Sequence, residues 1–265
     1  MISPLASIHP NAKIGSDVTI EPFAVIHDNV TIGDGSHIMS HAVLMAFSRI
    51  GKGCIIFPGA VIGAVPQDLK FIGEETTAEI GDYTTIRECV TVNRGTKDKF
   101  KTVIGQHCLL MAYAHVAHDC VLGDHVILAN AVQLAGHVEV GDYAIIGGLA
   151  GAHQFTRIGA HTYVAGHTVI RKDVPPYVKA AREPMSYAGL NIVGLQRRNF
   201  SQEKIDTISQ IYHLMFVGNH SISSAIERIK AEVADGEVKD EILQFVQNSR
   251  AGVIKRYTKN GVDED

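Results

Sequence analysis

An aliphatic residue stands at every sixth position through most of the first 170 residues of this chain. The series is interrupted twice, resumes in the same phase both times, and includes only one residue, Ala152, that is not a large aliphatic. Its members are Ile2, Ile8, Ile14, Ile20, Ile26, Ile32, Ile38, Leu44, Ile50, Ile56 and Ile62, then Ile80, Ile86 and Val92, then Ile104, Leu110, Val116, Leu122, Leu128, Leu134, Val140, Ile146, Ala152, Ile158, Val164 and Ile170. An α-helix repeats about every 3.6 residues and a simple strand about every two, so neither explains this period by itself. A six-residue repeat is typical of a parallel β-helix built from hexapeptides.

Two further sets of regularly spaced residues predict the cross-section of this β-helix. Small residues such as Ala24, Ala42 and Ala60 stand two positions before the aliphatic ones, so each side of a narrow prism would bury one large and one small side chain. Glycine recurs every eighteen residues, at Gly15, Gly33 and Gly51 and again at Gly105, Gly123, Gly141 and Gly159. Glycine is favoured where the backbone needs a positive φ or a close approach. We therefore expect three hexads per coil, with these glycines stacked at one corner of a triangular prism.

Two segments, 63–79 and 93–103, leave the repeat and are predicted to be loops that project from the prism. Neither carries an aliphatic residue at the positions where the period requires one, which are occupied by Asp68, Glu74 and Asp98. Long loops in compact domains are often functional.

The prism is predicted to end at residue 178, because Pro175 and Pro176 cannot donate hydrogen bonds to a continuing ladder. Helical patterns follow. Ser201 is a candidate N-cap, and Ser224 with Glu227 is a candidate capping box for a later helix. The expected fold is therefore all-β, a parallel β-helix over 1–178, followed by a small C-terminal α-helical domain over 179–265.

The composition excludes several classes of protein. The net charge of −4 argues against a nucleic-acid binder that works by counterion release. The chain contains no apolar run of about 18 residues and no basic and apolar start typical of a secretory signal, so we expect a cytoplasmic protein without a membrane span. Three of the four cysteines, Cys54, Cys108 and Cys120, occupy the small inward register and read as buried thiols rather than a disulfide or metal framework.

The eighteen-residue coil predicts which polar residues become neighbours. His118 stacks beneath Gly136 and Gly136 beneath Gln154, while Asp119 stacks beneath His137 and His115 beneath Gln133. His153 is adjacent to Gln154 on the upper coil. None of these polar residues occupies an inward register, so His118 and Asp119 should face outward, and the group should form one patch about 10 Å tall.

General-base chemistry is what such a patch can perform. An imidazole accepts a proton near neutral pH, and an adjacent carboxylate fixes its tautomer. The N–H of Gly136, with no Cβ beside it, could stabilise a developing oxyanion. No Ser or Cys stands beside His118 as a nucleophile, which favours direct transfer over an acyl-enzyme. Two other interpretations stay open: a polar face decorated with histidines, or a zinc site formed by His115, His118 and His137.

The chain resembles the UDP-N-acetylglucosamine O-acyltransferases that open lipid A biosynthesis, over essentially its whole length. The segments that carry the resemblance are Pro66–Phe71, Arg94–Thr96, Ala114–Cys120, Leu134–Val138, Ala152–Phe155, Asp173–Val178 and Gly194–Arg198. The resemblance implies a left-handed β-helix and a homotrimer with active sites between neighbouring prisms. It also implies an acyl donor carried on acyl carrier protein, UDP-N-acetylglucosamine as acceptor, and no cofactor or metal.

The resemblance also implies roles for individual residues. His118 matches the general base, Asp119 the residue that orients it, and Gly136 the oxyanion N–H. Substrate-binding or supporting positions are matched by Asp68 and Lys70 on the first loop, by His115, His137, His153 and Gln154 on the prism, and by Asn191, Arg197 and Arg198 beyond it. Gly166 matches the position that measures acyl length, and a glycine there leaves room for a long chain. Val193 departs from the family, which often has a glutamate there.

A different hexapeptide acyltransferase is the first alternative. The related glucosamine N-acyltransferases carry an additional N-terminal uridine-binding domain, whereas here the hexads begin at Ile2. An acetyltransferase that uses coenzyme A shares the repeat but lacks the resemblance. A non-catalytic trimeric scaffold or zinc protein is the alternative from another class.

Overall fold

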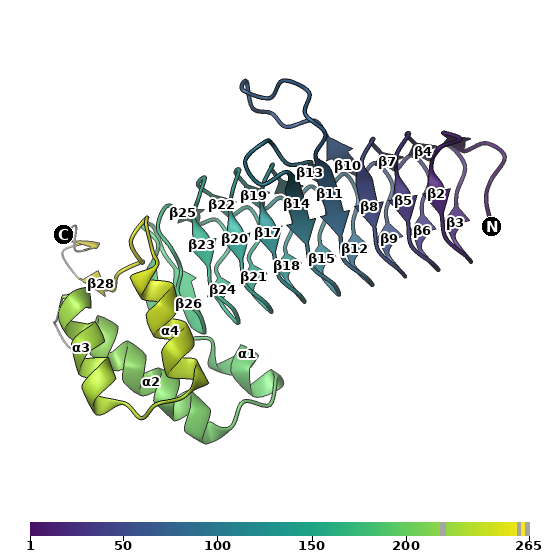
Figure 1. The fold of residues 1–265 in the computed structure, drawn as a ribbon. Coiled ribbons are helices and arrows are strands. Elements are labelled where there is room, and N and C mark those ends of the chain that lie inside the picture. The colour runs from purple at the N-terminus through teal and green to yellow at the C-terminus, as the bar shows by residue number, and fades with distance from the viewer. Residues whose placement is uncertain (218–220, 259–260, 263–265) are drawn as a thin grey trace.

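In a computed structural model, which describes residues 1–217, 221–258 and 261–262, the hexads wind into a triangular prism of three parallel sheets (Figure 1). The nine-stranded sheet contains β1 (Ser7–Ile8), β4 (Val25–Ile26), β7 (Val43–Leu44), β10 (Val61–Ala64), β13 (Thr91–Asn93), β16 (His115–Val116), β19 (Gln133–Leu134), β22 (Gly151–Ala152) and β25 (Val169–Ile170). The eight-stranded sheet contains β2 (Lys13–Ile14), β5 (Thr31–Ile32), β8 (Ser48–Ile50), β11 (Thr77–Ile80), β14 (Lys101–Ile104), β17 (Val121–Leu122), β20 (Glu139–Val140) and β23 (Arg157–Ile158). The ten-stranded sheet contains β3 (Thr19–Ile20), β6 (His37–Ile38), β9 (Ile55–Ile56), β12 (Thr85–Ile86), β15 (Leu109–Leu110), β18 (Ile127–Leu128), β21 (Ile145–Ile146), β24 (Tyr163–Val164), β26 (Val178–Ala181) and β27 (Ser186–Leu190).

Residues one coil apart pair as the eighteen-residue rule predicts. His115 pairs with Gln133 in parallel register, and Gln133 pairs with Gly151 on the next coil. The stacked corner glycines owe their identity to close approach rather than to conformation. A Cβ on Gly33 would lie 2.6 Å from the carbonyl carbon of Gly51, closer than two coils can tolerate.

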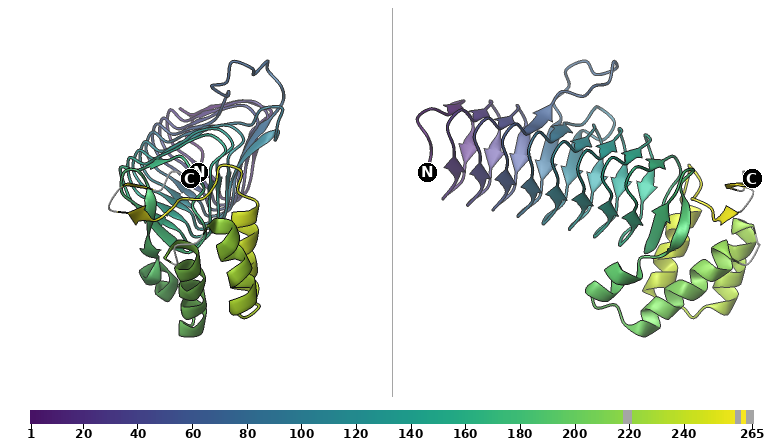
Figure 2. Two further views of the ribbon diagram at one scale, coloured as in Figure 1. Left: turned by 90° about the vertical axis from the view of Figure 1, so that its left-hand side faces the viewer. Right: turned by 180° about the vertical axis from the view of Figure 1, so that it is seen from behind.

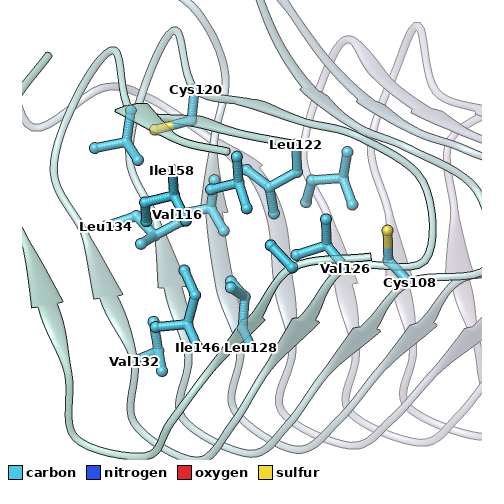
Figure 3. Close-up of a cluster of buried hydrophobic side chains, with 14 of the residues drawn as sticks. Cys108, Val116, Cys120, Leu122, Val126, Leu128, Val132, Leu134, Ile146 and Ile158 are labelled. Carbon is cyan, nitrogen blue, oxygen red and sulfur yellow. The ribbon is translucent and has the colours of Figure 1, made fainter. Parts of the chain in front are cut away.

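The aliphatic register fills the interior of the prism, as Figure 3 shows for the coils around Leu122, Leu128 and Leu134. These three side chains are at most 1% exposed. Cys108 and Cys120 fill small inward positions as free thiols, and burial raises their pKa to about 11 and about 12. Both thiols are therefore protonated and unreactive at neutral pH, as the sequence predicts.

Two loops project from the same corner of the prism, at residues 65–76 and 94–100 (Figure 1). The predicted bounds, 63–79 and 93–103, were too wide. β11 and β14 pair over four residues, from Thr77 opposite Lys101 to Ile80 opposite Ile104, so after each loop the ladder resumes two residues earlier than the two-residue strand of a regular hexad would.

The sheet also continues beyond residue 178, where the sequence predicts the prism to end. β26 begins at that residue, pairs in parallel with β24, and is followed by antiparallel β27. Pro175 and Pro176 lie in the turn before β26, where no ladder donor is needed, so they do not interrupt the sheet.

Helices α1 (Ile192–Arg197), α2 (Gln202–Phe216), α3 (Ile222–Glu232) and α4 (Glu237–Gln247) gather at the C-terminal end of the prism (Figure 2). A short hairpin follows, formed by β28 (Tyr257–Thr258) and β29 (Gly261–Val262). The buried hydroxyl of Tyr212 on α2 donates to the Pro176 carbonyl at 2.7 Å, which ties the helices to the prism. None of the helices in the described residues is long and apolar enough to cross a membrane.

One of the two predicted helix caps is correct. The Ser201 side chain accepts a hydrogen bond from Lys204 N and caps α2. The cap of α3 is Ser221 rather than Ser224, because Ser221 accepts from the backbone N–H of Ser224 and starts the helix one turn earlier. The predicted box with Glu227 is therefore wrong.

Candidate active site

The predicted patch lies at the corner where the chain passes from the nine-stranded to the eight-stranded sheet. Asp119, His137 and Phe155 occupy the same corner position on successive coils, and all three have a positive φ of 59°, 63° and 68°. The N–H of His137 donates to the His118 carbonyl at 3.0 Å, and that of Phe155 to the Gly136 carbonyl at 3.2 Å. The stacking predicted from the period is confirmed here.

His118 and Asp119 form a hydrogen-bonded pair at this corner. Nδ1 of His118 lies 2.8 Å from Oδ2 of Asp119, and the His118 side chain is only 10% exposed. An ionised carboxylate can only accept, so Nδ1 carries the hydrogen and Nε2 keeps a free lone pair. This is the tautomer that a general base requires.

Asp119 points away from the apolar interior, as predicted, yet its side chain is fully buried because the 94–100 loop covers it. Four hydrogen-bond donors surround the carboxylate: Thr96 N and Lys99 N on Oδ1, and Thr96 Oγ1 and His118 Nδ1 on Oδ2. Burial alone would raise the pKa of Asp119, but the hydrogen bonds, that of the Thr96 hydroxyl first, hold it below its ordinary value. Asp119 is therefore ionised at neutral pH.

Gly136 lies directly against the His118 ring. A Cβ at this position would come within 2.6 Å of Cε1 and 2.7 Å of Nε2. In the described part of the chain, the Gly136 N–H has no hydrogen-bond acceptor. A donor is thus available beside the basic nitrogen.

Two more predicted histidines flank this pair. His137 lies edge-on to His118, with 5.2 Å between ring centroids, and stacks on Phe155. Its Nδ1 is 3.2 Å from Asp98 Oδ2, without the alignment of a hydrogen bond. Burial lowers the pKa of His137, and burial followed by the nearby His118 lowers that of His115, whose Nδ1 lies 2.7 Å from Thr91 Oγ1. Both imidazoles are neutral at pH 7 and can bind substrate through hydrogen bonds.

A pocket of about 370 Å³ opens beside these rings, between the two loops and the corner. It is lined by four of the predicted residues, Asp68 and Lys70 from the first loop and His137 and Gln154 from the prism. Glu74, Thr96, Lys97, Asp98 and Phe155 complete the lining. His153 does not line it; this residue is exposed, and its carbonyl accepts a hydrogen bond from the Thr156 hydroxyl.

A larger pocket, of about 610 Å³, lies between the eight-stranded sheet and α4. None of the predicted site residues lines it, and its charged groups, among them Glu139 and Arg157, pair with each other at 3.4 Å. His118, Asp119 and Gly136 do not line the smaller pocket, but His118 lies edge-on to His137, which does. The smaller pocket is therefore the better candidate for substrate binding.

The zinc interpretation can be tested against these contacts. His118, Asp119 and His137 place three potential ligand atoms within 4.8 Å of one another, but His115, the third imidazole of the sequence hypothesis, is not in this group. The four donors that already surround Asp119 leave its carboxylate no free lone pair for a metal. The donor set does not fit a zinc site.

The residues predicted to bind the nucleotide differ from one another in their surroundings. Asn191 caps α1, with Nδ2 donating to the His161 carbonyl at 2.8 Å and Oδ1 accepting from Gly194 N, so its amide serves the local fold. Arg198 lies over the Tyr143 ring at 4.8 Å, whereas Arg197 is exposed. Of the two adjacent arginines, therefore, Arg197 has the side chain that is more accessible to a nucleotide.

The predicted site is also spread over different corners of one chain. Arg198 packs at the corner between β20 and β21, and Gly166 follows β24 at the corner between the ten- and nine-stranded sheets. The predicted stacking of Gly166 over Gly148 and Asn130 is confirmed by bonds from His167 N and Leu149 N to the carbonyls below. One face of the prism, about 20 Å wide at 3.3 Å per residue, separates each from the His118 corner.

Sequence reasoning missed the residues that enclose Asp119. Thr96 belongs to the Arg94–Thr96 motif, but a six-residue period cannot say where a loop outside the repeat folds back. The polar residues of the 94–100 loop follow no pattern that would indicate its contact with Asp119.

The repeats define the class of protein. A family model for the bacterial transferase hexapeptide, in six repeats, matches residues 29–64 and 101–136, so this is a hexapeptide-repeat transferase. A second model, described as UDP-N-acetylglucosamine O-acyltransferase domain 2, matches residues 173–254. The chain belongs to the UDP-N-acetylglucosamine O-acyltransferase family, and its prism is the left-handed parallel β-helix of that family.

Individual relatives agree with this assignment. An acyl-(acyl-carrier-protein)–UDP-N-acetylglucosamine O-acyltransferase of Anaeromyxobacter is 42% identical over 199 residues, covering 75% of this chain and 77% of the relative. The UDP-N-acetylglucosamine acyltransferase structure from Bacteroides fragilis superposes with a TM-score of 0.95 at 49% identity, covering 96% of this chain and all of the other. That from Francisella novicida superposes with a TM-score of 0.95 at 36% identity, covering 100% and 97%.

Proposed function

We propose that this protein transfers an (R)-3-hydroxyacyl group from acyl carrier protein to the 3-hydroxyl of UDP-N-acetylglucosamine, the first step of lipid A biosynthesis, in the cytoplasm. The observation that carries the mechanism is the His118–Asp119 pair, with the free Nε2 held against Gly136. The names of the relatives support the choice of donor and acceptor.

In this mechanism, Nε2 of His118 removes the proton from the sugar hydroxyl as its oxygen attacks the thioester carbonyl. Asp119 stabilises the imidazolium that forms, and the Gly136 N–H donates to the oxyanion. When the tetrahedral intermediate collapses, the C–S bond breaks and the departing thiolate takes the proton back from His118. No acyl-enzyme forms. General-base catalysis of this kind contributes about 10²–10⁴-fold to the rate.

We also propose that the working unit is a homotrimer whose sites lie between chains. Arg197 and the α1 region sit a full prism face away from His118, too far for one UDP-sugar to bridge both along a single chain. A second copy that presents its α1 corner to the His118 corner of the first would complete the site.

The test is an assay with UDP-N-acetylglucosamine and a series of 3-hydroxyacyl carrier proteins, read by mass spectrometry. His118→Ala should fold and trimerise like the wild type but lose at least about 10²-fold in kcat. His41→Asn is the matched control, since His41 is an exposed histidine on the early coils that stacks on Phe23, and it should keep the wild-type rate. Near-normal turnover of His118→Ala would remove His118 from the mechanism, and stoichiometric zinc in the purified protein would favour the metal alternative.

A further inference from the structure

The hydroxyl of Thr96 reaches the same carboxylate oxygen that holds His118. Thr96 Oγ1 donates to Asp119 Oδ2 at 2.7 Å, and His118 Nδ1 lies 2.8 Å from that oxygen. The other oxygen, Oδ1, is held by the backbone N–H groups of Thr96 and Lys99 at 3.0 and 3.2 Å. All four contacts are buried or partly buried, so they form in a medium where hydrogen bonds are strong.

The loop is built so that this hydroxyl has one orientation. Thr96 Oγ1 accepts a hydrogen bond from Asp98 N at 3.3 Å, which leaves its hydrogen for Asp119. Gly95 sets the path of the loop, since a Cβ there would lie 2.2 Å from Lys101 N, and its own N–H donates to the Thr77 carbonyl. Phe100 N closes the turn onto the Thr96 carbonyl at 2.8 Å.

We infer that Thr96 is a positioning residue for the reaction, which extends His118 and Asp119 into a three-residue chain. This inference rests on the proposed function of His118 as the base. Thr96 does not touch substrate through this hydroxyl; it fixes the rotation of the Asp119 carboxylate, so that Oδ2 faces Nδ1 of His118 and Nε2 faces the acceptor.

In Thr96→Val the carboxylate keeps three of its four donors, and His118 Nδ1 alone holds Oδ2, so rotation about the Cβ–Cγ bond is less restrained. Whenever Oδ2 turns away, His118 loses the acceptor that keeps its hydrogen on Nδ1, and the other tautomer, with hydrogen on Nε2, cannot act as a base. The loss should appear in kcat rather than in binding, because the hydroxyl donates its hydrogen to Asp119 Oδ2 and its contribution acts on the step in which charge develops.

Thr96→Val removes the hydroxyl and keeps the β-branched shape, and Thr96→Ser keeps the hydroxyl. Thr96→Val should lower kcat about 10–100-fold with KM for UDP-N-acetylglucosamine within about twofold, and Thr96→Ser should restore kcat to within about threefold of wild type. Thr84→Val is the matched control: Thr84 is a fully buried threonine whose hydroxyl donates to the Gly105 carbonyl far from the site. It should lower the thermal midpoint without changing kcat.

A double substitution separates positioning from simple support of the fold. In the Asp119→Asn background, Thr96→Val should change kcat by less than about twofold, because the carboxylate through which Thr96 acts is gone. A full and multiplicative loss there, or wild-type kcat in Thr96→Val alone, would overturn the inference. If His118→Ala is also active, the proposed function has failed; if it is inactive while Thr96→Val is fully active, only the role of Thr96 has failed.

Discussion

The imidazole of His118 packs against the α-carbon of Gly136 with no room for a methyl group between them. A Cβ on Gly136 would come within 2.6 Å of Cε1, and the Asp119 bond at Nδ1 prevents the ring from simply turning aside. The glycine thus has two uses in the proposed mechanism: it provides an unobstructed N–H, and it makes space for the base.

Gly136→Ala should therefore lower kcat by about 10–10³-fold, because the ring must leave either Asp119 or the acceptor. Steady-state kinetics of the purified variant would measure this. Gly151→Ala is the matched control on the adjoining coil, since the nearest atom to its Cβ would be the Gln133 carbonyl oxygen at 3.9 Å. Equal activity of the two alanine variants would show that the close approach at 136 is irrelevant to the chemistry.

Asp119→Asn should reduce kcat by about 10²–10⁴-fold while the protein stays folded. An amide oxygen in the place of Oδ1 can accept from the loop, but the amide nitrogen in the place of Oδ2 would face both the Thr96 hydroxyl and His118 Nδ1, and would favour the wrong imidazole tautomer. The measurement is kcat alongside the urea midpoint. A variant that is inactive only because it unfolds would lose both together, whereas the expected result separates them.

Periodicity alone was enough to place His118, Gly136 and His137 together, because in a β-helix residues one coil apart in the sequence stack directly above one another. The same rule failed where the chain leaves the repeat. Nothing in the spacing of 94–100 indicates that this loop folds over Asp119, so a side chain expected only to face outward is fully buried.

Beyond the prism, the role of a residue depends on its local hydrogen bonds more than on its match to a family position. Asn191 matches a nucleotide contact by resemblance, yet its amide is bound to the His161 carbonyl and to Gly194 N, as expected of a helix cap. The corners of the prism set a further limit on predicting the site from the sequence. Sequence spacing tells which corner a residue occupies, but Arg197 and His118 lie at different corners of one chain, and only a second copy of the chain could bring the two corners together.

Arg197→Ala and Arg198→Ala should have different effects. Arg197 is exposed, so its loss should raise KM for UDP-N-acetylglucosamine about tenfold and leave the unfolding midpoint unchanged. Arg198 lies over Tyr143 and donates to the Gly194 carbonyl, so its loss should also lower the midpoint. Kinetics and urea unfolding of both variants test this. A KM unchanged by Arg197→Ala would remove that residue from the nucleotide site.

Gly166→Met should shift the preferred acyl chain to a shorter length if this position measures the chain. A Cβ there would lie 2.8 Å from the Gly148 carbonyl oxygen, so the substitution both fills space beside the backbone and forces a small local shift. The acyl series read by mass spectrometry gives the length profile. Gly236→Ala, at the N-cap of α4 with open space around its Cβ, should leave that profile unaltered. An unchanged profile in Gly166→Met would show that another residue sets the length.

His161 should make the fold sensitive to acid. Its ring stacks between Tyr143 and Tyr177, and burial, followed by the charge of Arg198, lowers its pKa from the ordinary value of 6.5 to about 4. Between these two values the unfolded chain binds a proton that the folded chain does not. Stability from this residue is therefore complete above pH 6.5, falls as the pH drops toward 4, and is constant below it.

His161→Phe removes the titration and keeps the ring, and Phe155 shows that phenylalanine tolerates the positive φ of this kind of corner. Since Nδ1 of His161 is buried and has no hydrogen-bond partner among the residues that the structure describes, the substitution breaks no side-chain bond at that nitrogen. Between pH 7 and pH 5 the wild type should lose about 2 kcal/mol more than the variant, at equal protein concentration. Other groups titrate in both proteins, so the difference in urea unfolding isolates His161. Parallel pH profiles for the two proteins would mean that His161 is protonated in the folded state near its ordinary pKa.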